Sequence, residues 1–332
     1  MAGTDMAGRD PAARGGAERP LLLGDAEVRA RLDARTAVDA VRAALLAHHS
    51  GALAAPPRAH SPLGPGNLVF TSGRLADRGV HGFRVYDTFA GGEQLVAVWD
   101  EDSGRILALV HGGELGPRRT GAIGALALDA SARPGPVRLG LVGTGVQAWC
   151  QLWALLALRE VEDVVVAART PGSAARFASR AAAELGVRVR AADGAAEAVR
   201  DRDAVVLATD SPVPVIEADW VAPGTHVSTL GPKNRARHEL PPELAARADV
   251  IVTDSRAQAG AAADPAPAGG GAVSGAAPLA DPGRMAELGA VLAGEAQARG
   301  SERDVTLFWS VGLAGTEVAL AAALARALTA AE

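Results

Sequence analysis

Three arginines, Arg58, Arg84 and Arg119, stand in sequence surroundings that suit them to hold an anionic substrate. Arg58 follows Pro56-Pro57, which stiffens the loop that presents it; Arg84 lies in a predicted strand, and Arg119 lies near the start of a predicted helix. A planar guanidinium can hold a carboxylate through two parallel hydrogen bonds. Solvated surface arginines are the competing interpretation, because the chain is rich in arginine.

A fourth cationic residue, Lys233, is the single lysine among 33 lysine and arginine residues. It lies in the segment Gly231-Pro232-Lys233-Asn234, directly after a predicted strand. A compact, titratable ammonium differs from a guanidinium, so a retained lysine suggests a position where arginine would not serve. Chance retention explains it equally well. Lys233 could donate a proton, hold a carboxylate or be exposed.

The stretch Val137–Ala148 predicts a dinucleotide-binding turn, because an apolar strand runs into Gly143-Thr-Gly145-Val-Gln-Ala148 and then into a helix. Gly143 would make the tight turn, Gly145 would admit a pyrophosphate, and the small Ala148 would let helix and strand pack closely. The N–H groups at the start of the helix would hold the phosphates. A second apolar run, Val164–Ala168, follows one helix later, as a βαβ unit requires.

The end of that second run indicates which nicotinamide cofactor the chain prefers. Ala168-Arg169-Thr170 contains no acid to accept a hydrogen bond from a ribose 2′-hydroxyl, whereas Arg169 can meet a 2′-phosphate. The sequence therefore favours NADP(H) and leaves NAD(H) open. The residues expected to contact the cofactor are Gly143, Thr144, Gly145, Val146, Gln147, Arg169, Thr170 and, after a further strand, Ala208 and Thr209.

The proline- and glycine-rich segment at 134–136 divides the elements that must position these residues. Before it, the patterns predict an α+β region with an antiparallel or mixed sheet: strands at 21–24, 67–70, 82–86, 94–99 and 104–110, and helices at 26–33, 37–49 and 120–132, the first two capped by Asp25 and Thr36. After it, strands and helices alternate, which predicts an α/β fold with a doubly wound parallel sheet. Residues 257–282 are expected to form a mobile loop, followed by a helix at 285–293, a strand at 305–310 and a helix at 315–329.

The composition excludes several classes of function. A net charge of −5 gives no reason to expect nucleic acid as a partner, and no run of eighteen apolar residues predicts a membrane span. The seven histidines show no metal-ligand spacing, so no metal is expected. Cys150 is the only cysteine and lies within a predicted helix, so we expect a packing role, no internal disulfide and a cytoplasmic protein. Residues 1–20 are expected to be a disordered leader, not a signal peptide.

Five segments in this order resemble the ornithine cyclodeaminase/μ-crystallin family, over a range from Leu21 to about Leu328. The segments are Pro56-Pro57-Arg58, Gly82-Phe83-Arg84-Val85, Arg119-Thr120-Gly121-Ala122, Gly143–Ala148 and Thr306–Ala314. The resemblance implies a homodimer whose subunits hold a Rossmann-type NAD(P)-binding domain (134–304) and an α+β domain for substrate binding and dimerisation (21–133 with 305–332).

The resemblance also carries roles to individual residues. Arg58 and Arg119 match family arginines that hold the substrate carboxylate, and Arg84 stands where the cyclodeaminases usually have lysine. Lys233 falls near a family aspartate that assists amine deprotonation. The resemblance further implies cofactor contacts from Arg119, Thr120, Ser310 and Gly312. Because arginine is a poor proton shuttle and an ammonium cannot replace a carboxylate base, both departures weaken an ornithine-specific interpretation.

Three functions remain after this comparison. The first is an NAD(P)H-dependent reductase or dehydrogenase of an imine or amino acid carboxylate, in which Arg58 and Arg119 bind the carboxylate, Arg84 orients the substrate and Lys233 supplies a proton. The second is an amino-acid cyclodeaminase with bound NAD⁺ that releases ammonia. The third is a non-catalytic protein that binds NADP(H) and a small ligand.

Overall fold

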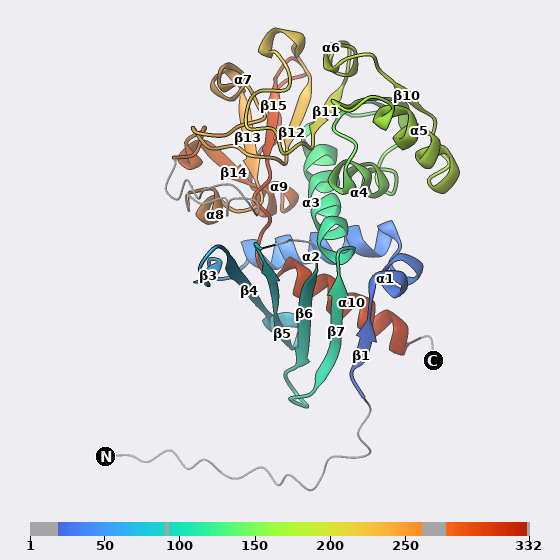
Figure 1. Cartoon of the computed structure of the whole chain (residues 1–332). Helices are drawn as coiled ribbons and strands as arrows, with labels where there is room; N and C mark the ends of the chain where they lie inside the picture. Colours follow the sequence, from blue (N-terminus) through green and yellow to red (C-terminus); the bar gives the residue numbers. More distant parts are fainter. Residues whose placement is uncertain (1–18, 90–92, 261–276, 331–332) are drawn as a thin grey trace, which may run out of the picture.

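The computed structural model describes residues 19–89, 93–260 and 277–330, which form two lobes joined through helix α3 (Leu115–Ser131). One lobe holds strands β1 to β7 and the other holds strands β8 to β15 (Figure 1). Helix α3 packs against α2 (Ala34–His49) of the first lobe and against α4 (Val146–Leu155) of the second. The residues at the start of α3 therefore lie where the two lobes meet.

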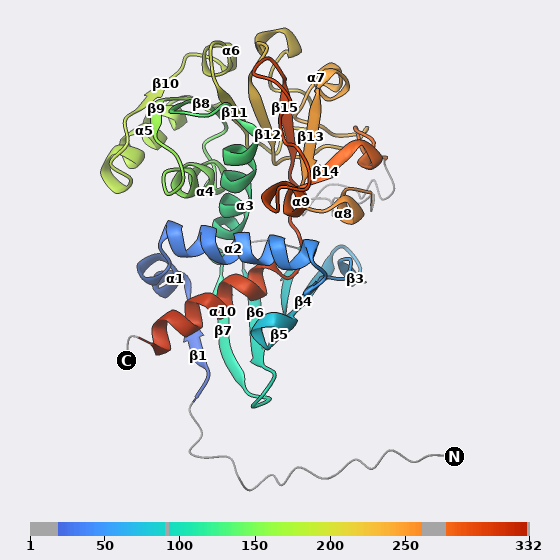
Figure 2. The same ribbon diagram turned by 180° about the vertical axis from the view of Figure 1, so that it is seen from behind.

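The first lobe contains a mixed sheet in which β1 pairs parallel to β7 and the other neighbours pair antiparallel, in the order β1-β7-β6-β5-β4-β2 with β3 beside β4. Its strands are β1 (Leu21–Leu23), β2 (Leu53–Ala54), β3 (Ala59–Pro62), β4 (Asn67–Leu75), β5 (Val80–Asp87), β6 (Gln94–Asp100) and β7 (Ile106–Gly112). Helix α10 (Thr316–Thr329) crosses one face of this sheet, and α2 packs against α10 (Figure 2). The residues of β4 alternate between buried and exposed, because only that face is covered.

The second lobe contains an eight-stranded sheet in which every pair is parallel, in the order β10-β9-β8-β11-β12-β15-β13-β14. Its strands are β8 (Val137–Val142), β9 (Val161–Ala167), β10 (Val189–Ala191), β11 (Ala204–Leu207), β12 (His226–Thr229), β13 (Val250–Thr253), β14 (Met285–Glu287) and β15 (Thr306–Trp309). From β8 the chain adds β9 and β10 on one side and then β11 and β12 on the other, so the strand order reverses between β8 and β11. Ligands of open α/β sheets bind at such a switch point.

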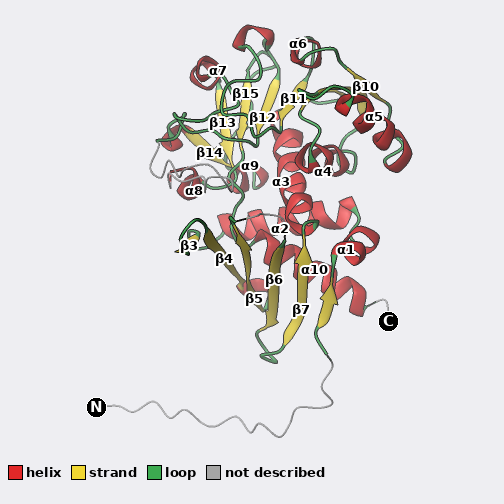
Figure 3. Cartoon of the chain, viewed as in Figure 1, coloured by secondary structure: helices red, strands yellow, loops and turns green. Residues whose placement is uncertain are grey.

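Helices cover both faces of the parallel sheet (Figure 3). Val164 and Val166 of β9 belong to one core, whereas Val165 and Ala167 belong to the other, as the period of two along a strand requires. The remaining helices are α1 (Asp25–Arg31), α4 and α5 (Ser173–Glu184), α6 (Ala195–Val199), α7 (Pro242–Arg247), α8 (Arg256–Gly260) and α9 (Leu288–Leu292), with 3₁₀ turns at Ala76–Arg78, Ala218–Trp220 and Pro282–Arg284.

The predicted α/β class, with a parallel Rossmann-type sheet and a second α+β unit, is confirmed, but several elements differ from expectation. Residues 285–287 form β14 beside β13, so the helix expected at 285–293 begins only at Leu288. Strand β15 lies inside the parallel sheet, between β12 and β13, and α10 alone returns to the first lobe. The short strands β2 and β3 have no alternating pattern and were not predicted.

The helix caps also differ from expectation. Asp33 caps α2 and accepts a hydrogen bond from the Thr36 N–H at 2.8 Å, and Gly24 occupies the cap of α1. The Asp25 carboxylate instead accepts from the N–H groups of Gly113 and Glu114, which lead into α3. The expected leader lies almost entirely outside the described residues, as does most of the loop expected at 257–282, of which residues 257–260 belong to α8.

Candidate active site

The turn after β8 has the backbone that a diphosphate-binding turn requires. Gly143 has φ +112°, and a Cβ at this position would lie 2.3 Å from the carbonyl oxygen of Ala208. Gly145 is the N-cap of α4; among the described residues, no side chain caps this helix and no atom lies within 4 Å of a Cβ built at Gly145. The first turn of α4 thus has uncapped N–H groups, the feature with which helix N-termini bind phosphate groups.

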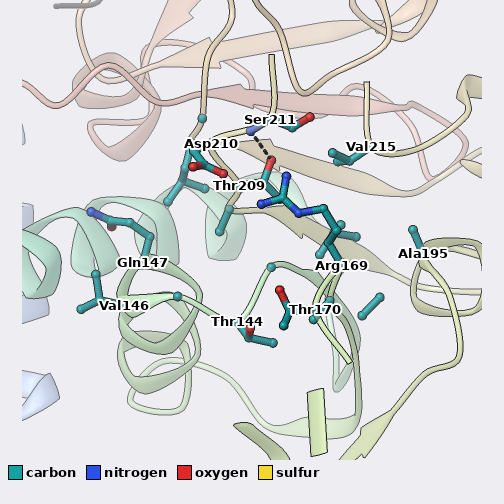
Figure 4. A pocket seen from close by; sticks show the side chains of 18 residues that line it. Thr144, Val146, Gln147, Arg169, Thr170, Ala195, Thr209, Asp210, Ser211 and Val215 are labelled. Atoms are coloured by element: carbon teal, nitrogen blue, oxygen red, sulfur yellow. Dashed lines mark hydrogen bonds between the residues drawn. The ribbon is translucent and has the colours of Figure 1, made fainter. Parts of the chain in front are cut away.

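A cleft of about 640 Å³ opens beside this turn, at the switch point between β8 and β11. Figure 4 shows Arg169 and Thr170 entering from the end of β9 and Thr209, Asp210 and Ser211 from the end of β11. The structure brings to this cleft the following residues that the sequence predicts for cofactor binding: Gly143, Thr144, Gly145, Val146, Gln147, Arg169, Thr170, Ala208 and Thr209.

A buried carboxylate, Glu239, holds two walls of this cleft together. Its Oε2 accepts from the Thr209 N–H at 2.8 Å and the Thr209 hydroxyl at 2.7 Å. Its Oε1 accepts from the N–H groups of Leu230 and Gly231 at 2.9 and 2.6 Å and from the Thr229 hydroxyl at 2.9 Å. Because the side chain is fully buried, these bonds replace the water that the charge loses.

A second cavity of about 430 Å³ adjoins the cleft, since Gln147 and Leu230 line both. It lies where β3, the start of α3, and the loops after β12 and β15 meet. The predicted residues found here are Arg58, Arg119, Thr120, Lys233, Ser310 and Gly312. The second cavity, and not the nucleotide cleft, therefore holds the four residues for which the family resemblance implied cofactor contacts: Arg119, Thr120, Ser310 and Gly312.

Arg58 and Arg119 converge on Gly312 inside this cavity. A Cβ at Gly312 would lie 2.7 Å from Nη1 of Arg119 and 3.0 Å from Nη2 of Arg58, and Gly312 has φ +75°. Arg58 donates from Nη2 to the carbonyl groups of Val311 and Gly312 at 2.6 and 3.0 Å. Nη1 and Nε of Arg119 are buried and have no hydrogen-bond partner among the described residues. Two guanidinium groups that meet at one point can hold a carboxylate through charge-assisted hydrogen bonds.

Arg84 lies elsewhere than the sequence suggested, because it is absent from the described lining of the cavity. Its Nη1 donates to Oε1 of Glu317 at 2.9 Å, and its guanidinium stacks 4.3 Å from the centre of the Tyr86 ring. Burial lowers the pKa of Arg84, and the Glu317 charge offsets only part of this shift. Glu317 in turn accepts from Nη2 of Arg119, so Arg84 stands behind Arg119 relative to the cavity.

Lys233 lines the cavity from the loop after β12. Its Nζ donates to the carbonyl groups of Leu230 and Gly231 at 3.1 and 2.5 Å. The backbone of Lys233 pairs with that of His238, so the loop is held in a defined shape. The ammonium therefore lies at the end of the cavity that adjoins the nucleotide cleft, where Leu230 lines both spaces.

Sequence reasoning missed several residues that shape the site. Asp254 is buried and accepts from the N–H groups of Val311 and Leu313 at 2.8 and 2.6 Å, which fixes the loop that carries Gly312. In the amide orientation that satisfies both of its polar atoms, Gln258 donates to the Gly312 carbonyl at 3.0 Å. His60 of β3 lines the cavity, and Glu239 and Glu317 hold the residues described above. The only local sequence signal for such residues is an acidic residue beside a predicted strand end, as at Asp254, or near a predicted helix start, as at Glu317.

The structure also bears on the cysteine, on metal binding and on membrane spans. Burial raises the pKa of the Cys150 thiol to about 12, which agrees with the predicted packing role. Among the described residues, no three His, Cys, Asp or Glu side chains are grouped so that they could hold a metal ion. None of the helices in the described ranges combines the length and apolar character needed to cross a bilayer.

Comparison with known proteins shows which proteins this chain resembles. The chain is 31% identical over 234 residues to the delta(1)-pyrroline-2-carboxylate reductase of Bacillus cereus, with 68% of each chain covered. The solved delta(1)-pyrroline-2-carboxylate reductase of Thermococcus litoralis, in complex with NADH and L-proline, is 26% identical, has a TM-score of 0.81 and covers 94% of this chain and 98% of its own. A solved archaeal alanine dehydrogenase dimer with bound NAD is 25% identical, with a TM-score of 0.80 and coverage of 94% and 97%.

The model of one family matches residues 19–330, a range that includes every described residue. The family resemblance drawn from the sequence segments is confirmed. The chain belongs to the ornithine cyclodeaminase/mu-crystallin family.

Proposed function

We propose that this protein is an NAD(P)H-dependent reductase that acts on the carbon–nitrogen double bond of a small imine carboxylate. The observation that carries the proposal is the convergence of Arg58 and Arg119 in a cavity that adjoins the nucleotide cleft at Gln147 and Leu230. A carboxylate held by the two arginines places the rest of a small substrate toward that junction. Of the relatives named above, one is named for the reduction of a cyclic imine carboxylate, delta(1)-pyrroline-2-carboxylate, and the other for the dehydrogenation of an amino acid, alanine.

Each residue then has a defined task. When bound in the cleft, the reduced nicotinamide cofactor supplies a hydride. Arg58 and Arg119 bind and orient the substrate carboxylate. Lys233 Nζ gives a proton to the substrate nitrogen, so that C=N becomes CH–NH when the hydride reaches carbon. The carbonyl groups of Leu230 and Gly231 hold the ammonium of Lys233 near the junction of the two cavities.

The cyclodeaminase alternative receives less support from the cavity. In that reaction the family aspartate assists deprotonation of the substrate amine. No aspartate or glutamate is found among the described residues that line the cavity, and Lys233 occupies the region where the acid was expected. An ammonium cannot accept the proton from an amine, so the geometry favours the reductase.

For the cofactor, we propose a preference for NADPH over NADH. Arg169 and Thr170 line the cleft at the end of β9, where a Rossmann fold contacts the adenosine ribose. Arg169 is exposed and forms no ion pair with any described residue, so its guanidinium can meet a 2′-phosphate. The residues at the end of β9 include no acid that would repel this phosphate.

The assembly that we propose is a homodimer, as the family resemblance implies. Phe70 and Leu95 are exposed on the face of the mixed sheet that α10 leaves open, and Val85 lies between them in the pairing register. An exposed apolar row on a sheet is typical of an interface. Sedimentation of the full chain would measure this, and a monomer at micromolar concentration would contradict it.

The reductase proposal is tested with the purified full chain and a panel of imines. The panel contains delta(1)-pyrroline-2-carboxylate, its six-membered homologue, and 2-oxo acids mixed with ammonia or methylamine. Oxidation of NADPH in equal amount to the imine consumed supports the proposal. Ammonia release from ornithine with oxidised cofactor and no net redox change would instead establish the cyclodeaminase. Cofactor binding without turnover on the panel or on ornithine would establish the non-catalytic binding protein.

Arg119→Ala examines the carboxylate receptor directly. Loss of a charge-assisted hydrogen-bonding partner costs about 1.5–3 kcal/mol, which lowers kcat/KM by ~10–150-fold. The matched control is Arg35→Ala, which removes an exposed arginine of α2 and leaves kcat/KM unchanged. Unchanged kinetics in Arg119→Ala would remove Arg119 from the site.

A further inference from the structure

Glu317 is not among the described residues that line the second cavity, but its carboxylate contacts Arg119, which does line it. Its side chain is 1% exposed and lies in the first turn of α10, the helix that returns from the parallel sheet to the first lobe. Burial alone would raise the pKa of Glu317, but the guanidinium groups of Arg119 and Arg84 outweigh burial and lower it. The group is therefore a buried anion between two cations.

One oxygen of Glu317 joins these two cations. Oε1 accepts from Nη2 of Arg119 and from Nη1 of Arg84, the second at 2.9 Å. Nη2 of Arg119 is engaged by Glu317, whereas Nη1 is buried, has no hydrogen-bond partner among the described residues and lies 2.7 Å from the Cβ position built at Gly312. The ion pair thus engages Nη2 and leaves Nη1 as the donor nearer to Gly312.

A carboxylate that pairs with Arg119 also opposes substrate binding, because it neutralises the charge that attracts a second carboxylate. Arg84 removes this conflict. With Arg84 and Arg119 both positive and Glu317 negative, the three side chains carry a net charge of about +1, which is the charge of Arg119 alone. Arg84 does this from a position outside the described cavity lining, where 15% of its side chain is exposed.

We propose that Glu317 and Arg84 are positioning residues for the substrate carboxylate: Glu317 orients Arg119, and Arg84 compensates the charge of Glu317 so that Arg119 still attracts an anion. The proposal rests on the proposed function, since it concerns the carboxylate that the reductase would bind. It assigns Arg84 a role through Glu317 and Arg119, in place of the direct substrate contact expected from the sequence.

The test compares Arg84→Met, Glu317→Gln and the double variant with the wild-type chain. Two properties are measured: the KM and kcat for delta(1)-pyrroline-2-carboxylate, and the affinity for L-proline by calorimetry with oxidised cofactor present. Arg84→Met leaves Glu317 uncompensated, so KM and the proline Kd rise by about 10-fold or more while the cofactor Kd stays within about twofold. Glu317→Gln loses the ion pair that orients Arg119, so kcat falls.

The double variant decides between charge compensation and mere packing. Removing both charges returns the net charge to that of Arg119 alone, so the double variant recovers roughly 3–30-fold of the carboxylate affinity lost in Arg84→Met. A packing role predicts that the two losses add. Additive losses, or unchanged proline affinity in Arg84→Met, would overturn the proposal.

Two controls separate this result from other failures. Arg180→Met removes an exposed arginine that pairs with Glu184 at 3.0 Å in α5, and it leaves both properties unchanged. If the wild type binds L-proline but reduces no imine, the reductase proposal fails while the proline affinities still judge the positioning of Arg119. If the wild type reduces imines and the variants equal it, only the positioning proposal fails. A wild type that neither reduces imines nor binds L-proline would overturn both.

Discussion

Replacement of Glu239 by glutamine examines whether a charged carboxylate holds the nucleotide cleft together. In the wild type, both oxygens of Glu239 act only as acceptors, from three backbone N–H groups and two hydroxyl groups. Glutamine keeps the shape but turns one oxygen into an NH₂ group, which can only donate. At least one backbone N–H must then face a donor.

The position of least cost can be worked out from the contacts. The Oε1 site faces the N–H groups of both Leu230 and Gly231, whereas the Oε2 site faces the Thr209 N–H and a hydroxyl that can reverse its direction. The amide nitrogen therefore takes the Oε2 site and leaves the Thr209 N–H unpaired. Such a loss costs about 1–3 kcal/mol, and the melting temperature falls by roughly 2–10 °C.

The assay is thermal unfolding with and without NADPH, together with calorimetric titration of the cofactor. Because Thr209 and Gly231 line the cleft, Glu239→Gln also raises the cofactor Kd. Glu302→Gln, at an exposed position, serves as the matched control and changes the melting temperature by about 1 °C or less. A Glu239→Gln protein with wild-type melting temperature and cofactor Kd would refute the network as the support of the cleft.

Three further predictions concern the cofactor cleft and the core. Arg169→Ala raises the KM for NADPH by about 10-fold or more and leaves that for NADH within about twofold, because only NADPH has the phosphate that Arg169 would meet; an equal effect on both would contradict the preference. Gly143→Ala abolishes cofactor binding measured by calorimetry, because its Cβ would lie 2.3 Å from the Ala208 carbonyl oxygen. Gly260→Ala binds the cofactor normally, because among the described residues its Cβ would meet only Pro282 Cγ, at 3.8 Å. Burial lowers the pKa of His226 to about 3, and its ring nitrogens pair with Thr306 and Ser228. Below about pH 6.5 the unfolded chain gains a proton that the folded His226 refuses, so the free energy of unfolding falls toward pH 3 by about 1.4 kcal/mol per pH unit. Denaturant unfolding at pH 7.5 and 5.5 shows this loss in the wild type, and an equal loss in His226→Gln would contradict the assignment.

Much of the nucleotide-binding lobe was predictable because its determinants are local. The turn at Gly143 needs a glycine for its positive φ, and fully buried parallel strands read as apolar runs such as Val164–Val166. Such signals lie within a few residues of the structure that they specify. The residues that line the cleft follow from the same rule, since they come directly after strands whose ends meet at one edge of the sheet.

The placement of Arg84 and of strand β15 shows where local pattern stops. The sequence predicts that Arg84 contacts the substrate. The return of α10 to the first lobe instead brings Glu317, 233 positions further along the chain, into a hydrogen bond with its guanidinium. An apolar run such as Thr306–Trp309 fits either sheet, and its pairing with β12 and β13 decides which one it joins. Residue types and spacing therefore indicated the fold class, the nucleotide cleft and three candidate arginines, and the family resemblance selected Arg58 and Arg119 as the pair expected to hold a carboxylate. Which buried acid orients Arg119, and which arginine stands behind it, depends on ion pairs between distant segments, because such pairs form only when packing removes both partners from water.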